Sequence, residues 1–314
     1  RIDREGWARF IDSHPQGNVF QTPPFHSFLS ADPAHRPFVA AAVSGENGAV
    51  GGILQGIVQR EKGLASHFSR RAIVWGGPLA RDDDEEITSA LLNAAVGLLK
   101  EEVIYLEFRN LFDLKRQRGI FERLGFRYEE HCNFHVALGD RESVRGRYSK
   151  NRLRQIKKSG DRGASVREAA SLEDVREFYS ILRDLYARKI RKPLPGRSFF
   201  EGFFASGLGV YLVVEHQGRI IGGIMCPFDR RKVYEWYVCG MDGEIPDVHP
   251  SVLATNAAIE WGLERGMSCF DFMGAGAPGQ DYGVREFKAR FGGELVEHGR
   301  YRAVFSPFLY SLGK

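Results

Sequence analysis

The chain has 314 residues, of which 43% are hydrophobic and 27% charged, and its net charge is +4. This length accommodates two ordinary domains, and the composition excludes collagen-like and disordered classes. No apolar run approaches the roughly 18 residues of a membrane-spanning helix, and no signal-peptide apolar region follows Arg1. We therefore expect no transmembrane segment and a cytoplasmic protein, with the inner face of the membrane as an alternative place of action.

The helices and strands expected in the first half follow from apolar spacing and from turn residues. The expected helices are Asp3–Ser13, Pro24–Ala31, Asp83–Lys100 and Lys115–Leu124. The expected strands are Phe38–Val43, Gly52–Gln59, Ala72–Trp75, Val103–Phe108 and Phe126–Leu138.

The second half repeats this order. The expected helices are one capped by Ser171, then Ser198–Ala205, Ser251–Arg265 and Val284–Phe291. The expected strands are Val210–Glu215, Ile220–Phe228, Val233–Cys239, Met267–Met273 and Glu294–Phe305. Both halves therefore have the order ααβββαβαβ.

Short motifs also recur between the halves. Asn256–Ile259, Phe270–Gly274 and Val284–Gly292 have diverged counterparts at Asn93–Val96, Tyr105–Phe108 and Ile120–Phe126, so that Glu107 corresponds to Asp271. A repeat this long favours two similar domains over a solenoid of short units. Only the second copy carries Lys288 and a glycine-rich loop, which predicts that the second domain holds the chemistry.

Positive charge is concentrated between the two halves. Residues 141–167 contain ten Lys or Arg and two acids, for +8, so the rest of the chain carries −4. Arg147, Lys150 and Arg154 recur at helical steps and form a predicted cationic ridge that suits phosphates. A solvated linker helix is the alternative interpretation. No aromatic stripe accompanies the ridge, so any nucleic acid is expected to bind through its backbone.

The four cysteines are Cys132, Cys226, Cys239 and Cys269. They form neither a CxxC pair nor a Cys/His spacing typical of a metal site, so we expect buried thiols, no metal and a reducing compartment.

The order of elements in both halves resembles the GCN5-related N-acetyltransferase (GNAT) fold, a mixed sheet that opens in the middle to admit an acyl donor. Two such domains joined by a basic segment resemble the FemABX family of aminoacyl-tRNA-dependent transferases. The motifs that carry this resemblance are Tyr148–Lys158, Phe270–Gly274 and Phe287–Gly292. The predicted fold class is mixed α/β (α+β), with GNAT-like domains at residues 1–140 and 171–314 and a basic connecting helix at residues 141–170.

Three residues are candidates for catalysis, and for the first of them the role comes from the family resemblance. It implies that Lys288 binds an anionic part of a substrate, although an ordinary surface lysine is an equal alternative. Asp271 alternates with two aromatic residues along its strand and could accept the amine proton, or it could be a buried acid that binds loop amides. Tyr237 could donate a proton or hydrogen bond, and packing is the alternative.

The candidate substrate-binding residues are Arg147, Lys150, Arg154, Trp236, Gly274, Gly276 and Arg285. Trp236 borders the expected donor slot, and Arg285 opens the last helix. The loop from Gly274 to Gly279 matches GxGxxG, but Pro278 interrupts it and too little chain follows for a dinucleotide fold. We expect a substrate-facing loop instead.

Two departures from known patterns affect the expected substrates. Neither Gly76–Arg81 nor Asp247–Ser251 matches the [QR]xxGx[GA] loop that binds the pyrophosphate of acetyl-CoA in GNAT enzymes. Leu29 stands where FemABX enzymes acting on muramyl-pentapeptide precursors have a phosphate-binding lysine. Some FemABX members also insert a long helical arm in the second domain. Here the segment from Ser171 to Ala205 is long enough for two helices only, so we expect no such arm.

The predicted function is transfer of an aminoacyl or acyl group to an amine of a cell-envelope precursor, such as a peptidoglycan intermediate. The expected co-substrate is aminoacyl-tRNA or acyl-CoA, with no tightly bound cofactor. The expected partners are charged tRNA and an anionic nucleotide-sugar or lipid-linked precursor. The alternatives are a CoA-dependent N-acetyltransferase and a non-catalytic RNA- or phosphate-binding protein. The sequence indicates no oligomeric state.

Overall fold

A computed structural model describes residues 2–45, 48–59, 70–279 and 283–312. It divides into two compact units, the first made of Arg1–His131 with Glu297–Lys314 and the second of Cys132–Val296. The prediction of two mixed α/β units is confirmed. Within the described residues no helix is long and apolar enough to cross a membrane.

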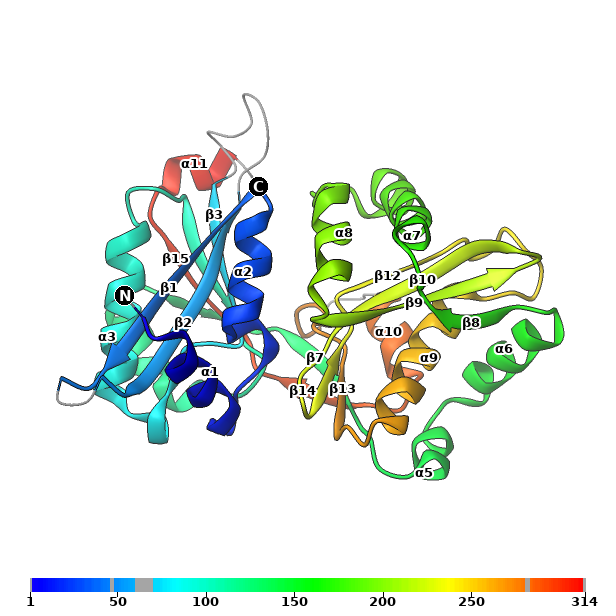
Figure 1. Cartoon of the computed structure of the whole chain (residues 1–314), viewed down its shortest axis with the longest axis horizontal. Coiled ribbons are helices and arrows are strands. Elements are labelled where there is room, and N and C mark those ends of the chain that lie inside the picture. Colours follow the sequence, from blue (N-terminus) through cyan, green and yellow to red (C-terminus); the bar gives the residue numbers. More distant parts are fainter. Residues whose placement is uncertain (1, 46–47, 60–69, 280–282, 313–314) are drawn as a thin grey trace. The chain divides into compact units, whose positions relative to one another are not determined.

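The first unit is built on a seven-stranded sheet in the order β1-β2-β3-β5-β15-β6, with β4 paired to β2 (Figure 1). Its strands are β1 (His35–Val43), β2 (Val50–Gln59), β3 (Arg71–Trp75), β4 (Leu79–Ala80), β5 (Tyr105–Arg109), β6 (Arg127–Glu129) and β15 (Arg300–Val304). Its helices are α1 (Arg4–Ser13), η1 (Val19–Gln21), α2 (Pro23–Ala31), η3 (Arg81–Asp83), α3 (Glu85–Leu99), η4 (Lys115–Gln117), α4 (Arg118–Arg123) and α11 (Pro307–Leu312).

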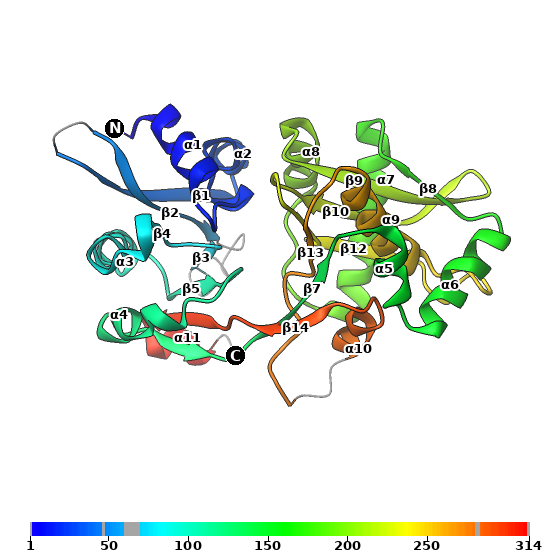
Figure 2. The same cartoon turned by 90° about the horizontal axis from the view of Figure 1, so that it is seen from below.

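The second unit has two four-stranded sheets, β12-β10-β9-β8 and β11-β13-β7-β14 (Figure 2). The strands are β7 (Cys132–Ala137), β8 (Ser165–Glu168), β9 (Gly209–His216), β10 (Arg219–Pro227), β11 (Lys232–Tyr234), β12 (Tyr237–Gly240), β13 (Cys269–Asp271) and β14 (Glu294–Glu297). The helices are α5 (Arg141–Gly146), α6 (Lys150–Asp161), α7 (Leu172–Leu185), η5 (Tyr186–Ile190), α8 (Arg197–Ser206), α9 (Pro250–Glu264) and α10 (Gly283–Ala289).

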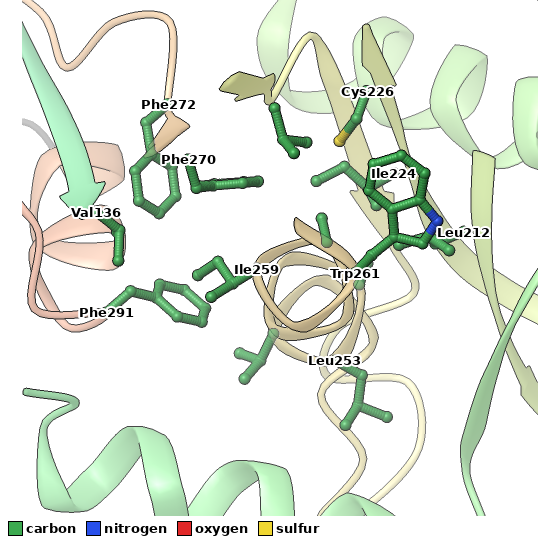
Figure 3. Packing of buried hydrophobic residues seen from close by; sticks show 14 of the residues in the cluster. Val136, Leu212, Ile224, Cys226, Leu253, Ile259, Trp261, Phe270, Phe272 and Phe291 are labelled. Atoms are coloured by element: carbon green, nitrogen blue, oxygen red, sulfur yellow. The ribbon is translucent and has the colours of Figure 1, made fainter. Parts of the chain in front are cut away.

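The apolar core of the second unit is arranged around α9. Leu253, Ile259 and Trp261 of this helix lie between two groups of side chains (Figure 3). One group comes from β7, β13 and the turn after α10 and includes Phe270 and Phe291; the other comes from β9 and β10. Because α9 is apolar nearly all round, it packs against both sheets at once and joins them into one unit.

The unit boundaries differ from those expected at residues 140 and 170. The strands expected at 126–138 and 294–305 are each broken into two, and the pieces pair in different units. β6 and β15 pair with each other in the first sheet, while β7 and β14 pair in the second unit. Hydrophobic alternation continues through both pieces of each strand, so the sequence pattern does not show that the pieces belong to different units.

The basic segment at residues 141–170 is also part of the second unit rather than a connecting helix. Its helix α6 packs against α9, and its C-terminal part forms the additional strand β8, which pairs with β9. Arg152 of α6 is fully buried, with its guanidinium 4.4 Å and 4.3 Å from the ring centroids of Phe287 and Phe291. The guanidinium also donates to the carbonyl of Phe287 at 2.8 Å. This segment therefore supports α10, the helix that carries Lys288.

Candidate active site

The expected strand Val233–Cys239 is interrupted at Glu235 and Trp236, and the interruption opens the sheet. The N–H of Glu235 donates to the carbonyl of Asp271 at 2.8 Å, on the β13 side. The next N–H, of Trp236, donates to the carbonyl of Met225 on β10 at 3.1 Å. Consecutive residues therefore bond to different sheets, which separates β11 from β12. An opening between neighbouring strands is the feature by which a GNAT-like fold admits an acyl group.

Lys288 lies beside this opening and is buried. Its ammonium donates to the carbonyls of Phe272 at 2.6 Å and Gly274 at 2.9 Å, and it lies 3.1 Å from a carboxylate oxygen of Glu235. The Glu235 side chain is only 3% exposed and also accepts from Thr255 of α9 at 3.3 Å. Lys288 is thus not an ordinary surface lysine. An ammonium has three N–H groups, and here each has an acceptor within the protein.

Asp271 is completely buried and belongs to a polar group on β7 and β13. Its carboxylate accepts from Asn133 at 2.6 Å, from the N–H of Met273 at 2.7 Å and from Nε2 of His135 at 3.0 Å. Burial alone would raise the pKa of Asp271, but His135, Lys232 and Asn133 outweigh it, and the pKa is lowered. Asp271 is therefore ionised at neutral pH and binds a loop amide, the second of its two predicted interpretations.

His135 was missed in the sequence, where it is one residue of an apolar strand. It lies opposite Asp271 in the β7–β13 register, and its side chain is 18% exposed. The Nε2–H of His135 donates to the Asp271 carboxylate, and Nδ1 is the second nitrogen of the ring. The sequence does contain polar residues at 133 and 135 on an otherwise apolar strand. That they lie opposite an acid is known only from the strand register.

The glycine-rich loop is held by backbone and arginine contacts. Gly274, Gly276 and Gly279 have φ values of 141°, 76° and 72°, conformations that favour glycine. Arg285 donates to the carbonyl of Ala275 at 3.0 Å and to that of Ala277. The loop shape thus accounts for all three glycines and for Arg285, whose contacts here are with the protein itself. Residues 280–282 lie outside the described part of the loop.

Trp236 and Tyr237 are packed in an aromatic cluster with helix α8. The Trp236 ring lies 5.4 Å from that of Phe199 and 5.8 Å from that of Phe203, and the Tyr237 ring lies 5.1 Å from that of Phe200. Both side chains are half-buried. These contacts fit the packing interpretation of Tyr237 and place a hydrophobic wall next to the opening.

The remaining candidates lie on the surface of α5 and α6 and contact none of the residues above through their charged groups. Arg147 donates to the carbonyl of Ala137 at 2.6 Å, and Arg154 donates to the Asn151 side chain at 2.8 Å. Lys150 is exposed and has no ion pair within the described ranges. Most other cations of residues 141–167 pair with carboxylates; these are Arg141, Arg145, Lys157, Lys158, Arg162 and Arg167. Arg147, Lys150 and Arg154 are thus the cations that remain for an external anion.

In α9 and α3, the first helical turns meet acceptors from the chain itself. In α9 the N–H and hydroxyl of Ser251 both donate to Asp242, and the N–H of His249 donates to Ser159 at 2.9 Å. In α3 the Asp84 side chain accepts from the N–H of Ile87 at 2.9 Å. Acids continue from residue 82 to residue 86. An external pyrophosphate would meet carboxylates at both positions, where free N–H groups are needed to bind it.

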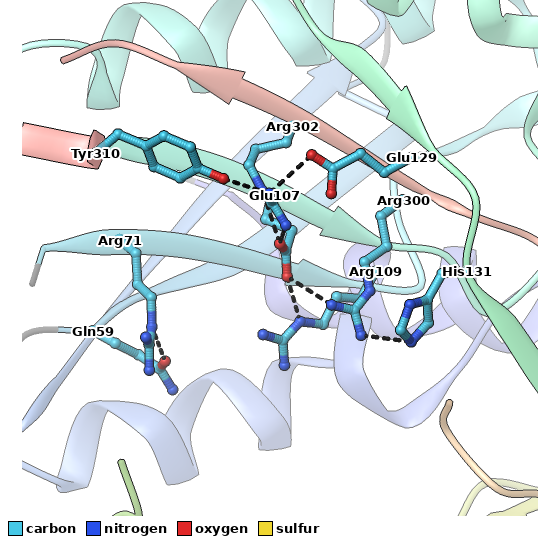
Figure 4. Close-up of polar contacts among 9 residues, drawn as sticks. All are labelled: Gln59, Arg71, Glu107, Arg109, Glu129, His131, Arg300, Arg302 and Tyr310. Atoms are coloured by element: carbon cyan, nitrogen blue, oxygen red, sulfur yellow. Dashed lines mark hydrogen bonds and ion pairs between the residues drawn. The ribbon is translucent and has the colours of Figure 1, made fainter. Parts of the chain in front are cut away.

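In the first unit, the position that corresponds to Asp271 is occupied by Glu107, which belongs to a network of ion pairs. Glu107 of β5 is 3% exposed and pairs with Arg109 at 2.7 Å, Arg300 at 3.5 Å and Arg302 (Figure 4). Burial raises the pKa of Glu107, but the three guanidiniums outweigh it and lower the pKa to about 2. The first copy thus has a permanently charged structural network in place of a histidine–aspartate pair.

Burial keeps the thiols of Cys226, Cys239 and Cys269 protonated, and the described residues form no metal cluster. Burial raises the pKa of Cys226 well above its usual value and that of Cys269 to about 12, so these thiols are protonated at neutral pH. No group of three His, Cys, Asp or Glu side chains in this part of the chain could hold a metal ion.

Comparison with known families gives one match. Residues 146–289 match the family model described as an acetyltransferase (GNAT) domain. The matched residues lie within the second unit, which is therefore similar to a GNAT acetyltransferase domain. The match includes α6, which agrees with the placement of the basic segment inside this unit. A search of curated proteins finds no match.

Solved structures show that the GNAT-like fold extends over the whole chain. FemX is similar with a TM-score of 0.74 and 15% identity, covering 99% of this chain and 98% of FemX. The C-terminal domain of a putative lysylphosphatidylglycerol synthetase from Agrobacterium fabrum has a TM-score of 0.63 and 14% identity, with 99% and 94% covered. A tandem GNAT protein from the clavulanic acid biosynthesis pathway has a TM-score of 0.58 and 13% identity, with 97% and 94% covered. The fold is FemABX-like, and the comparisons together support an acyltransferase.

Proposed function

We propose that the second unit transfers an aminoacyl or acyl group from an ester donor to an amine on a phosphate-bearing cell-envelope precursor. The carboxylates at the N-termini of α9 and α3 are the observation that favours an ester donor over acyl-coenzyme A. Coenzyme A presents a pyrophosphate, and both helix N-termini meet it with carboxylates from Asp242 and Asp84. An aminoacyl ester of tRNA needs no such pyrophosphate site. FemX and the lysylphosphatidylglycerol synthetase domain share this fold, which supports the same class of reaction.

In the proposed reaction the substrate amine attacks the carbonyl carbon of the ester. A C–N bond forms and the C–O bond to the donor breaks. Nδ1 of His135 accepts the proton released by the amine, and the proton then goes to the leaving oxygen. Asp271 does not touch the amine; it holds the Nε2–H of His135 and stabilises the imidazolium that forms transiently. Positioning of the two substrates supplies most of the remaining acceleration.

Lys288 and Arg285 have positioning roles in this proposal. Lys288 joins Glu235 at the strand interruption to the carbonyls of Phe272 and Gly274, and so fixes both sides of the opening. Arg285 keeps the following loop in place through the carbonyls of Ala275 and Ala277. Binding of a substrate anion by Lys288, as the family resemblance implies, would require it to release one of its three acceptors.

The cations without carboxylate partners support a site for substrate phosphates. Arg147, Lys150 and Arg154 lie on α5 and α6 with no acid neutralising them in the described structure. We assign to them the phosphates of the nucleotide-sugar or tRNA substrate. Each such contact is electrostatic, so substrate affinity should weaken as salt concentration rises.

Mass spectrometry of transfer products tests the proposal. The full-length protein is incubated with a charged-tRNA pool, and separately with an acyl-CoA pool, against UDP-muramyl-pentapeptide and simple amines. We expect a mass gain with charged tRNA that is lost in His135→Gln and kept in Arg127→Gln, an exposed residue of the first unit. A gain with acyl-CoA alone would replace this proposal by a CoA-dependent N-acetyltransferase. Binding of RNA without transfer from any donor would favour the non-catalytic alternative.

A further inference from the structure

A second concentration of positive charge lies outside the proposed site. The connection between α7 and α8, residues 186–196, contains Arg188, Lys189, Arg191 and Lys192 and no acidic residue. Its first part is the π-helix η5, which ends at Arg191 in a left-handed conformation with φ of 54°. We call residues 186–196 the basic connection. The proposed transfer reaction does not use it.

The four cations of the basic connection are exposed, and none pairs with a carboxylate within the described residues. The arginines of the flanking helices differ in this respect. Arg176 of α7 lies 2.8 Å from Glu201, and Arg197 of α8 lies 3.4 Å from the same carboxylate. Charge is therefore balanced on the helices and unbalanced on the connection between them. Such an unbalanced cluster attracts a surface of opposite charge.

Apolar side chains lie among these cations. Ile190 is 37% exposed and has two cations directly before it and two directly after it. Pro193 is exposed and Leu194 is half-buried. Binding to an RNA backbone would leave these apolar groups in water. An anionic membrane surface uses both kinds of residue, because cations meet headgroup phosphates while apolar side chains enter the boundary with the acyl chains.

A hollow of about 420 Å³ lies between the two flanking helices. It is lined by Arg176, Tyr179, Ser180, Arg183 and Arg197. Arg183 precedes the basic connection and Arg197 follows it, so the hollow is next to the exposed cations. Its three arginines have carboxylate partners, Glu201 for Arg176 and Arg197 and Asp184 for Arg183, so the unpaired charge next to it is that of the basic connection.

We propose that the basic connection is a membrane-binding surface specific for anionic phospholipid headgroups. This membrane binding is a property separate from acyl transfer, because lipid binding requires neither an acyl donor nor an acceptor. It also bears on the site: the ring of Tyr186, the first residue of the connection, lies 6.4 Å from that of Tyr237 on β12. Tyr237 follows the strand interruption directly, so a lipid-bound connection would hold the opening close to the headgroups, where a lipid-linked acceptor lies.

Vesicle co-sedimentation of the full-length protein measures this property directly. The vesicles are phosphatidylcholine alone or phosphatidylcholine with phosphatidylglycerol. The variant Arg188→Gln/Lys189→Gln/Arg191→Gln/Lys192→Gln is compared with Lys100→Gln/Arg127→Gln, two exposed cations of the first unit. Thermal unfolding confirms that each variant is folded. Ile190→Ser tests the apolar contribution separately.

We expect the wild type to bind the anionic vesicles and not the neutral ones, with affinity falling as salt rises. Each removed cation should lower the partition coefficient by roughly fivefold, so the quadruple variant should lose several hundredfold. The control variant should bind like the wild type, and Ile190→Ser should lose binding that persists at high salt. Equal binding by wild type and quadruple variant would overturn the proposal. So would loss of binding to a labelled single-stranded RNA with vesicle binding unchanged, which would assign the surface to RNA.

Failure of this proposal is distinguishable from failure of the proposed function. Transfer to a soluble amine acceptor is measured without vesicles, and it should be unchanged in the quadruple variant. Loss of transfer in that variant without vesicles would show that the basic connection belongs to the donor or acceptor site instead.

Discussion

Replacement of Lys288 probes the energetics of the site most directly. The variant Lys288→Met removes the donor to the carbonyls of Phe272 and Gly274 and leaves Glu235 as an unpaired carboxylate. That carboxylate is 3% exposed, so water cannot replace the ammonium. Removing one partner of a buried ion pair costs about 3–5 kcal/mol. We expect the free energy of unfolding of the second unit to fall by that amount.

A double-mutant cycle separates the buried charge from the other lost contacts. The variant Lys288→Met/Glu235→Gln leaves no buried charge at this position, and the amide oxygen that replaces the carboxylate can still accept from Thr255. We expect it to recover about 2 kcal/mol of the loss. Urea denaturation followed by tryptophan fluorescence measures the wild type, Lys288→Met, Glu235→Gln and the double variant, since Trp236 and Trp261 report on the second unit. A Lys288→Met protein as stable as the wild type would refute the buried-pair reasoning.

Transfer rates of the same variants distinguish a positioning role of Lys288 from binding of a substrate anion. If it only positions the opening, the double variant should regain part of the transfer rate along with stability. If Lys288 binds a substrate anion, as the FemABX resemblance implies, the double variant should be stable and still inactive. The rate is measured at a temperature where every variant is folded, so that unfolding does not contribute.

Three further predictions concern other residues. The fall in the pKa of Glu107 from 4.5 to about 2 corresponds to about 3 kcal/mol at pH 7, so Glu107→Gln should be less stable by up to that amount. Because the folded pKa is depressed, this stabilisation is present above pH about 4.5 and disappears as pH falls towards 2; denaturation curves at several pH values should show the two proteins converging in acid. Arg152→Ala should cost about 2–4 kcal/mol in urea denaturation through lost stacking on two phenylalanines, and Arg152→Lys should restore little of it, since lysine lacks the planar group. His135→Gln should lower the turnover number about 100-fold or more with little change in KM, and a rate equal to that of the wild type would exclude His135 as the proton acceptor.

Much of the fold could be predicted because local signals agree with it. The repeat of helix, strand and helix around Glu107 and Asp271 indicated two similar units, and both acids are buried on equivalent strands. The interruption at Glu235 could not be predicted, since residues 233–239 form one continuous β-prone run and only pairing with two different strands breaks it.

The site was predicted in part for the same reason. Phe287 and Phe291 face the core as their spacing indicates, which placed Lys288 near the helix edge. Its burial depends on carbonyls about fifteen residues away and on Glu235, contacts that no local pattern contains. His135 lies opposite Asp271 only because of the β7–β13 register, so neither spacing nor residue type identified this pair.

Strand β15 belongs to the first unit but follows the second unit in the sequence. The two units are therefore completed in a fixed order during synthesis. In the first sheet β15 lies between β5 and β6, yet in the sequence it comes after the whole second unit. All of residues 132–296, by contrast, leave the ribosome before β15 does. The second unit can therefore close its core first, while the first waits with an open gap between β5 and β6. A ribosome that stops just before Arg300 would release a protein whose second unit is whole and whose first unit exposes two unpaired strand edges.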